Sequence, residues 1–134
     1  MRRLATIEQD GWALESGEAR HAAHPDTFQM PSRHDRDNLR VGQAVQLLFQ
    51  IGTVHEDGST EVAVERMWAT MVGRVGDFYV GILDSQPDGV EPGQGIDRGL
   101  EFGFMAEHVI DIVDPPRDWL LRTHGERLKL ADKA

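Results

Sequence analysis

The side chains best suited to chemistry by type and spacing are carboxylates, serines and histidines that follow apolar runs. Asp84 and Ser85 come directly after the apolar segment 78–83 and shortly before Pro87, and residues at such strand ends often carry function. An aspartate beside a serine could form an acid–base or nucleophilic pair. A nucleophilic serine also needs a base within reach, and the Gly-x-Ser-x-Gly motif is absent. Because Asp and Ser before proline are common turn formers, we favour a turn here.

A second candidate is the pair Glu107 and His108, which follows the aromatic segment 100–104. A histidine beside a carboxylate could shuttle protons or bind a metal. We favour the alternative, in which Glu107 caps a local turn and His108 hydrogen-bonds inside the fold. A small hydrolase or metal-dependent enzyme would require Asp84, Glu107 and His108 to converge in one concave pocket.

Other patterns with metal or phosphate chemistry are weak. His21 and His24 are three residues apart and would share a helix face, but the His-Glu-x-x-His zinc signature is missing. The glycines at 89, 93 and 95 lack the Gly-Lys-Ser/Thr ending of a phosphate loop. We therefore expect no metal and no cofactor.

Composition limits the class of protein. The chain has 134 residues, no cysteine and a formal net charge of −9. This length suits one domain, and phosphate backbones would repel so acidic a chain, so nucleic-acid binding is not expected. No apolar run is long enough to span a bilayer, and no secretory signal is evident, so we expect a cytoplasmic protein without a membrane partner. The acidity would speed encounter with a basic protein.

Alternation of period two marks the first strand, within 43–51. Its apolar side chains share one face, opposite Gln46 and Gln50: Val45, Leu47, Phe49 and Ile51. This pattern predicts a half-buried strand. A strand from Ala44 to Ile51 at a sheet edge could support a homodimer.

A second strand is predicted from Thr60 to Gly73, after a turn at 55–59. Its alternating row consists of Val62, Val64, Trp68 and Val72. This row predicts that Trp68 is a core residue. Because Arg66 interrupts the row, the pattern also indicates a bulge or bend near 65–66.

The chain then turns at 73–77 and returns as a third strand over 78–83, forming a hairpin. Gly81 within that strand would let a bulky ring come close, and Trp68 is the candidate neighbour. A loop rich in Gly and Pro follows, then a strand at 100–104 and a turn with a short strand within 107–113.

Helices are predicted at the two ends of the chain. Ser16 caps a helix over 18–24, Ser32 caps a single turn near 33–38, and Asp118 caps a final helix. Together these patterns predict an α+β fold, a small, strongly bent and mainly antiparallel sheet of about five strands with short flanking helices and a C-terminal helix.

We expect a single domain over 1–134, with a core at about 25–113 and flanking segments at 1–24 and 115–134.

Three stretches, "LRVGQAVQLLF", "ERMWATMVGRVGDFYVGILDSQP" and "IDRGLEFGFMAEHVIDI", resemble small bacterial domains of unknown function that are related to immunity proteins of polymorphic-toxin systems. The similarity covers roughly 25–113 and includes matching residues at Gly42, Met67, Trp68, Gly81, Leu83, Asp84, Pro87, Gly99, Glu107 and His108. The sequence departs from the family pattern at Gln43, Ser85 and Leu100. The resemblance implies this fold and an immunity-like binding role, and it implies no catalytic residues.

The sequence thus favours a protein-binding module that presents an acidic surface to a basic protein over an enzyme. The predicted contact residues lie in the 84–97 loop and near the 55–59 turn: Asp84, Asp88, Glu91, Asp97, Glu56, Asp57 and Glu61. The enzyme described above and a small-ligand regulatory domain are the alternatives, since sequence does not reveal an apolar pocket.

Overall fold

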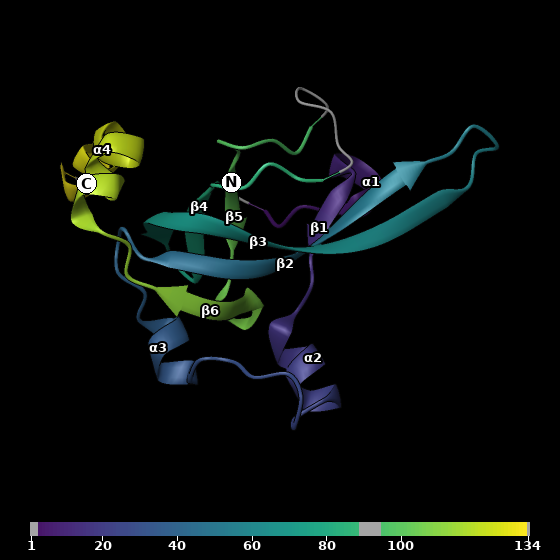
Figure 1. Cartoon of the computed structure of the whole chain (residues 1–134), viewed down its shortest axis with the longest axis horizontal. Coiled ribbons are helices and arrows are strands. Elements are labelled where there is room, and N and C mark those ends of the chain that lie inside the picture. The colour runs from purple at the N-terminus through teal and green to yellow at the C-terminus, as the bar shows by residue number, and fades with distance from the viewer. Residues whose placement is uncertain (1–2, 89–94, 134) are drawn as a thin grey trace.

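The computed structural model describes residues 3–88 and 95–133, and it has the α+β fold that the sequence predicts. A curled antiparallel sheet lies at its centre, with short helices beside it and the C-terminal helix at one end (Figure 1). The elements in chain order are α1 (Ile7–Asp10), β1 (Trp12–Leu14), α2 (Gly17–Ala23), α3 (Arg33–Asp37), β2 (Ala44–Val54), β3 (Thr60–Val75), β4 (Phe78–Leu83), β5 (Glu101–Phe104), the 3₁₀ helix η1 (Ala106–His108), β6 (Val109–Val113) and α4 (Arg117–Lys133).

The sequence leaves open whether the strand from Ala44 to Ile51 lies at a sheet edge, where it could support a dimer. In the structure this strand, β2, has partner strands on both sides. On one side, the whole of β2 pairs with residues 60–70 of β3. On the other side β6 pairs with residues 44–47 and β1 with residues 49–51. The sequence pattern of β2 could not show this, because its partners on that side come from distant parts of the chain.

The predicted inward-facing row of β3 is wrong except at Val72, which is buried. Met67, Ala69 and Met71 are buried in the core, whereas Val62 and Val64 are exposed and Trp68 is only half-buried. The predicted bulge near 65–66 is also absent, because the pairing of β2 with β3 runs without a shift past Arg66. Arg66 instead lies on the outer face, with its guanidinium 5.5 Å from the ring centre of Phe28, where a cation–π contact stabilises it.

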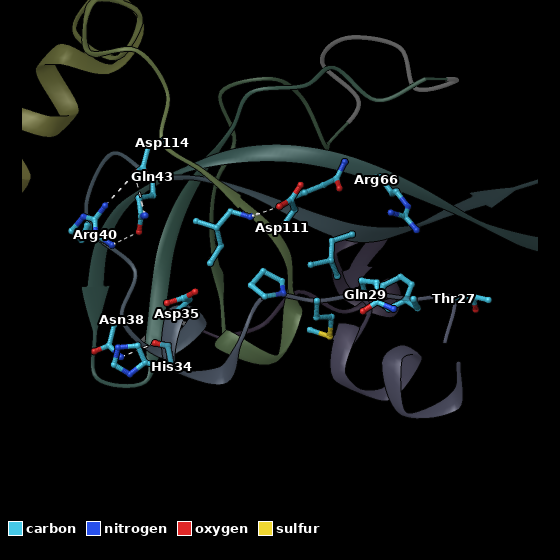
Figure 2. A pocket seen from close by; sticks show the side chains of 16 residues that line it. Thr27, Gln29, His34, Asp35, Asn38, Arg40, Gln43, Arg66, Asp111 and Asp114 are labelled. Atoms are coloured by element: carbon cyan, nitrogen blue, oxygen red, sulfur yellow. Dashed lines mark hydrogen bonds and ion pairs between the residues drawn. The ribbon is translucent and has the colours of Figure 1, made fainter. Parts of the chain in front are cut away.

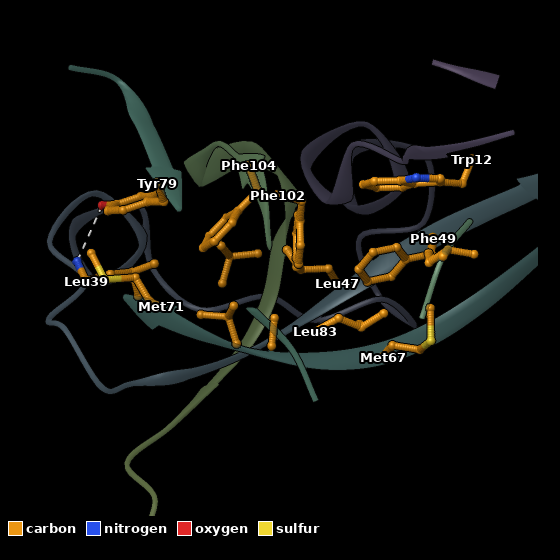
Figure 3. Packing of buried hydrophobic residues seen from close by; sticks show 14 of the residues in the cluster. Trp12, Leu39, Leu47, Phe49, Met67, Met71, Tyr79, Leu83, Phe102 and Phe104 are labelled. Carbon is orange, nitrogen blue, oxygen red and sulfur yellow. Dashed lines mark hydrogen bonds between the residues drawn. The ribbon is translucent and has the colours of Figure 1, made fainter. Parts of the chain in front are cut away.

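Aromatic rings fill the inside of the curled sheet (Figure 3). The ring centres of Trp12 and Phe102 are 5.8 Å apart in an edge-to-face arrangement, and Trp12 lies 5.6 Å from Phe49. Trp12 is on β1 and Phe102 on β5, at the two ends of the strand order. Their contact shows how strongly the sheet curls. Gly81 admits a bulky ring as predicted, but the ring is that of Phe104 and not that of Trp68.

The short helices α2 and α3 begin close to where the sequence predicts. The Ser16 hydroxyl accepts a hydrogen bond from the Ala19 N–H at the start of α2, and Ser32 caps α3 in the same way. α4 begins two residues earlier than expected, at Arg117, so Asp118 lies within its first turn instead of capping it. The helix geometry of α4 is interrupted at His124, where φ is −129°.

Candidate functional site

Asp84 follows the end of β4 and forms the centre of a polar chain that links the buried Thr70 to the nearly buried His124. Its Oδ2 atom accepts a hydrogen bond of 2.7 Å from the hydroxyl of Thr70, which has no solvent exposure. Its Oδ1 atom lies 2.7 Å from Nε2 of His124. A carboxylate can only accept hydrogen bonds, so the proton of this contact sits on the histidine. The Asp84 carboxylate therefore links β3 to α4.

The role of Ser85 is structural. Its hydroxyl oxygen accepts a hydrogen bond from the Trp68 N–H, and the Asp84 N–H donates to the Trp68 carbonyl. Both backbone groups of Trp68 are thus satisfied by the segment after β4. Among the described residues, Ser85 has no base beside its hydroxyl, so its contacts provide no nucleophilic pair.

His124 is the residue that the sequence reasoning missed. It sits at the break in α4, is nearly buried, and packs against the Trp119 ring with centres 5.6 Å apart. A pocket of about 1290 Å³ lies beside it and is also lined by Arg98, Arg122 and Arg127. A histidine oriented by a carboxylate can act as a general base. The only local signal was Gly125, which follows His124 in a segment that otherwise favours a helix.

His108 has structural contacts. Its Nδ1 atom accepts a hydrogen bond of 2.9 Å from the Met105 N–H, which closes the η1 turn. Its side chain is buried, and burial lowers the pKa of His108 below the usual value, although the carboxylates of Glu107 and Glu18 oppose this shift. The imidazole is therefore held in its neutral form as part of the fold.

The structure does not bring Asp84 together with Glu107 and His108. Glu107 lines a pocket with Tyr79, near the start of β4, whereas Asp84 follows the end of that strand. At ~3.3 Å per residue, roughly 16 Å of strand separates Tyr79 from Asp84. The convergence that the enzyme hypothesis requires is therefore missing.

The acidic residues near the 55–59 turn lie at the free end of the β2–β3 hairpin. Every side chain from 53 to 64 is exposed, and Figure 1 shows this hairpin extending well beyond the other strands. Asp57 shapes the turn, because its Oδ1 atom accepts hydrogen bonds from the N–H and the hydroxyl of Ser59. These bonds hold the pKa of Asp57 below its usual range. Glu61 lies 3.0 Å from the imidazole of His55, and Glu56 is exposed beside them.

The 84–97 loop approaches the same strand further along. The backbone N–H of Asp88 donates a hydrogen bond of 3.0 Å to the Glu65 carboxylate. Glu61 and Glu65 are four residues apart on β3, so they point to the same face of the sheet. Asp97 is partly buried and accepts a hydrogen bond from Gln86, which ties the loop together. Glu91 lies outside the described residues.

A polar pocket of about 870 Å³ lies between α3 and the outer face of β2 and β6 (Figure 2). At one end, the Gln43 amide accepts a hydrogen bond from the Arg40 N–H and donates one to Asp114. Gly42 precedes it with a φ of 97°, a conformation that favours glycine. Gln43 therefore acts as a turn residue.

Among residues 3–88 and 95–133, no three histidine or carboxylate side chains gather as a metal site would require. No helix in the described part of the chain has the length and apolar content needed to cross a bilayer. Comparison with protein-family models, with curated proteins and with solved structures finds no match to this chain.

Proposed function

We propose that this protein is an immunity-like protein-binding module that presents an acidic surface to a basic partner protein. The surface consists of the free end of the β2–β3 hairpin and the adjoining part of the 84–97 loop, and we call it the acidic arm: Glu56, Asp57, Glu61, Glu65 and Asp88. The observation that carries the proposal is the exposure of every side chain from 53 to 64 on a hairpin that extends away from the sheet.

Exposure on this scale is unusual for residues that pair as strands. An isolated two-stranded hairpin is only marginally stable in water, and strands normally bury one face. Val54 is 73% exposed and Val62 49% exposed. Exposed apolar side chains rimmed by charged residues are typical of protein interaction sites, which supports contact with another macromolecule over a purely structural role.

The negative charges of the acidic arm determine the sign of the charge that a partner surface must carry. Glu61 and Glu65 point to the same face, and the backbone of Asp88 holds the 84–97 loop against Glu65. The whole chain carries a net charge of −9. Surfaces of complementary potential accelerate encounter and suppress wrong partners, so the partner that fits this surface is a basic protein.

The test uses affinity capture from cell extract at low and then at raised salt, with two charge-matched variants. The arm variant carries Glu56→Lys and Glu61→Lys, and leaves Asp57 to hold the turn. The control variant carries Asp26→Lys and Glu126→Lys, which changes the net charge equally at two exposed residues on α4 and near α2. We expect the wild type and the control to retain a basic protein that salt releases, and the arm variant to lose it. Equal retention by both variants would remove the acidic arm from the proposal.

A further inference from the structure

In the described part of the chain, one edge of β3 has backbone groups without a partner strand. Within residues 3–88 and 95–133, β4 pairs with β3 only from Ala69 to Val75, so the same side of β3 from Thr60 to Arg66 has no neighbouring strand. This edge ends at Trp68, whose backbone N–H and C=O groups are hydrogen-bonded to the Ser85 hydroxyl and the Asp84 N–H. We call the stretch from Thr60 to Arg66 the open edge.

The register shows which residues direct their N–H and C=O groups outward from the open edge. Leu48 and Gly52 of β2 make backbone hydrogen bonds on the β1 side, to Glu15 and Gly11. Their partners on β3 are Arg66 and Val62. In an antiparallel pair the two partners direct their backbone groups either toward each other or both away. Arg66 and Val62 therefore direct theirs outward, and so does Val64 between them.

The two faces of the open edge carry different side chains, with valines on the outer face and glutamates on the opposite face. Val62 and Val64 lie on the outer face and are 49% and 42% exposed. Glu61 and Glu65 lie on the opposite face, because successive side chains of a strand point to opposite sides. A strand that added here would place every second side chain beside the valines and the intervening ones beside the glutamates.

We infer that the open edge of β3 binds an extended segment of the partner in which apolar and basic residues alternate. Backbone hydrogen bonds to Val62, Val64 and Arg66 would provide affinity, and the two faces would provide specificity, as in other cases of strand addition. Lysine or arginine side chains would meet Glu61 and Glu65, and apolar ones would cover the valines. This inference rests on the proposed function, whose acidic arm supplies the charges.

A second copy of this chain is a poorer occupant of the same edge. Antiparallel pairing of two β3 strands in one continuous sheet keeps their faces aligned, so Glu61 and Glu65 of both copies would share one face. Like charges on neighbouring strands are destabilising, and each chain carries a net charge of −9. The charges therefore select a basic strand.

The test uses two synthetic peptides as probes, with equal numbers of lysine and valine residues. In one peptide lysine and valine alternate, and in the other they form two blocks. We expect the alternating peptide to bind at least about tenfold more tightly. We also expect it alone to protect the backbone amides of Val62, Val64 and Arg66 from hydrogen exchange, measured by NMR on the wild-type protein.

The matched variants are Val64→Pro and Val64→Ala. Proline removes the outward N–H without breaking the pairing with β2, since proline is tolerated on edge strands, whereas alanine removes the side chain and keeps the N–H. We expect Val64→Pro to weaken binding of the alternating peptide about tenfold, and Val64→Ala to weaken its binding much less. The hydrogen-exchange measurement on the wild type does not depend on how well the proline variant folds.

The outcomes separate the two proposals. If both peptides bind equally at low salt, without protection of those amides, the inference of strand addition is overturned and the acidic surface stands. If neither peptide binds, the acidic surface itself fails, and the inference fails with it. If the free protein instead dimerises with concentration and the same amides become protected, the occupant is a second copy and the inference is overturned.

Discussion

The imidazole of His124 lies 2.7 Å from a carboxylate oxygen of Asp84, forty residues earlier in the chain. The same carboxylate accepts a hydrogen bond from Thr70 through its other oxygen. The C-terminal helix is thus joined to the sheet through a polar chain that reaches the fully buried hydroxyl of Thr70. Polar groups that are largely removed from water depend on each other, which makes this contact a sensitive point of the fold.

The first prediction concerns this chain. Asp84→Ala leaves the buried Thr70 hydroxyl and the nearly buried His124 without their shared acceptor. Because unsatisfied buried groups are costly, we expect the free energy of unfolding to fall by about 1–3 kcal/mol. Urea denaturation measures this change. Asp26→Ala, at an exposed position, is the control and should change stability by less than about 0.5 kcal/mol; equal effects from the two would contradict the prediction.

The second prediction is a pH dependence that arises from His108. Burial lowers its pKa in the folded protein below the usual 6.5, so below that pH the unfolded chain binds a proton that the folded protein resists. Stability contributed by this group is therefore complete above about pH 6.5 and falls as the pH drops toward the folded-state pKa. His108→Asn retains an acceptor for the Met105 N–H and lacks the titration.

The measurement is the free energy of unfolding from urea titrations between about pH 5 and 7.5, a range that brackets the usual histidine pKa. The wild type should lose more stability toward low pH than His108→Asn, with a difference in slope of at most about 1.4 kcal/mol per pH unit. Parallel curves for His108→Asn and wild type would show that His108 titrates alike in both states.

The third prediction concerns Tyr79, which is buried against Phe104. Its hydroxyl donates a hydrogen bond of 2.8 Å to the Arg36 carbonyl and accepts one from the Leu39 N–H (Figure 3 shows the latter). Tyr79→Phe preserves the ring stack and leaves both backbone groups unsatisfied, at a cost of about 1–3 kcal/mol. Hydrogen exchange should show the added opening around Arg36 and Leu39, while Phe104 stays protected. Uniformly faster exchange would instead indicate a general loss of stability.

The fourth prediction compares two glycines of the β3–β4 hairpin. A Cβ atom on Gly81 would lie 3.0 Å from the Phe104 ring, and one on Gly73 would lie 3.9 Å from Val80. Gly81→Ala therefore overpacks the core, and we expect a loss of about 1–3 kcal/mol. Gly73→Ala makes only an ordinary contact and should be nearly neutral. Thermal unfolding of both variants measures the difference, and equal melting temperatures would contradict it.

Local patterns predicted most of the fold. The alternation of Val45, Leu47, Phe49 and Ile51, the turn residues and the serine caps at Ser16 and Ser32 all act over a few residues, and the structure has them where expected. The inward row of β3 could not be read in the same way. Valines at Val62 and Val64 look like core residues, but they lie on the projecting hairpin, and the core is filled instead by Met67, Ala69 and Met71.

The polar contacts of the candidate site were not predictable for a related reason. The sequence identifies Asp84 as a candidate because it follows a strand. The position of its partner His124 depends on a break in α4 and on how that helix packs against the sheet, which the sequence pattern does not show. The buried Arg36, which forms an ion pair of 2.7 Å with Glu18 and donates to the Ala106 carbonyl, is another case. The sequence shows that Arg36 and Glu18 carry opposite charges, but it does not show that the two side chains lie close together.

The sharing of one edge of β2 by β1 and β6 has a consequence for the order of assembly. The meander from β2 to β5 joins strands that follow one another along the chain, and such local pairings form quickly. β1 and β6 must return from the two sides of that meander to close the same edge. Loop closure makes these returns the slow step, so the amides of β1 and β6 should exchange with solvent before the β3 amides that hydrogen-bond to β2. During folding, the β2–β5 meander in the middle of the chain therefore becomes ordered first, and the segments that contain β1 and β6 become ordered last.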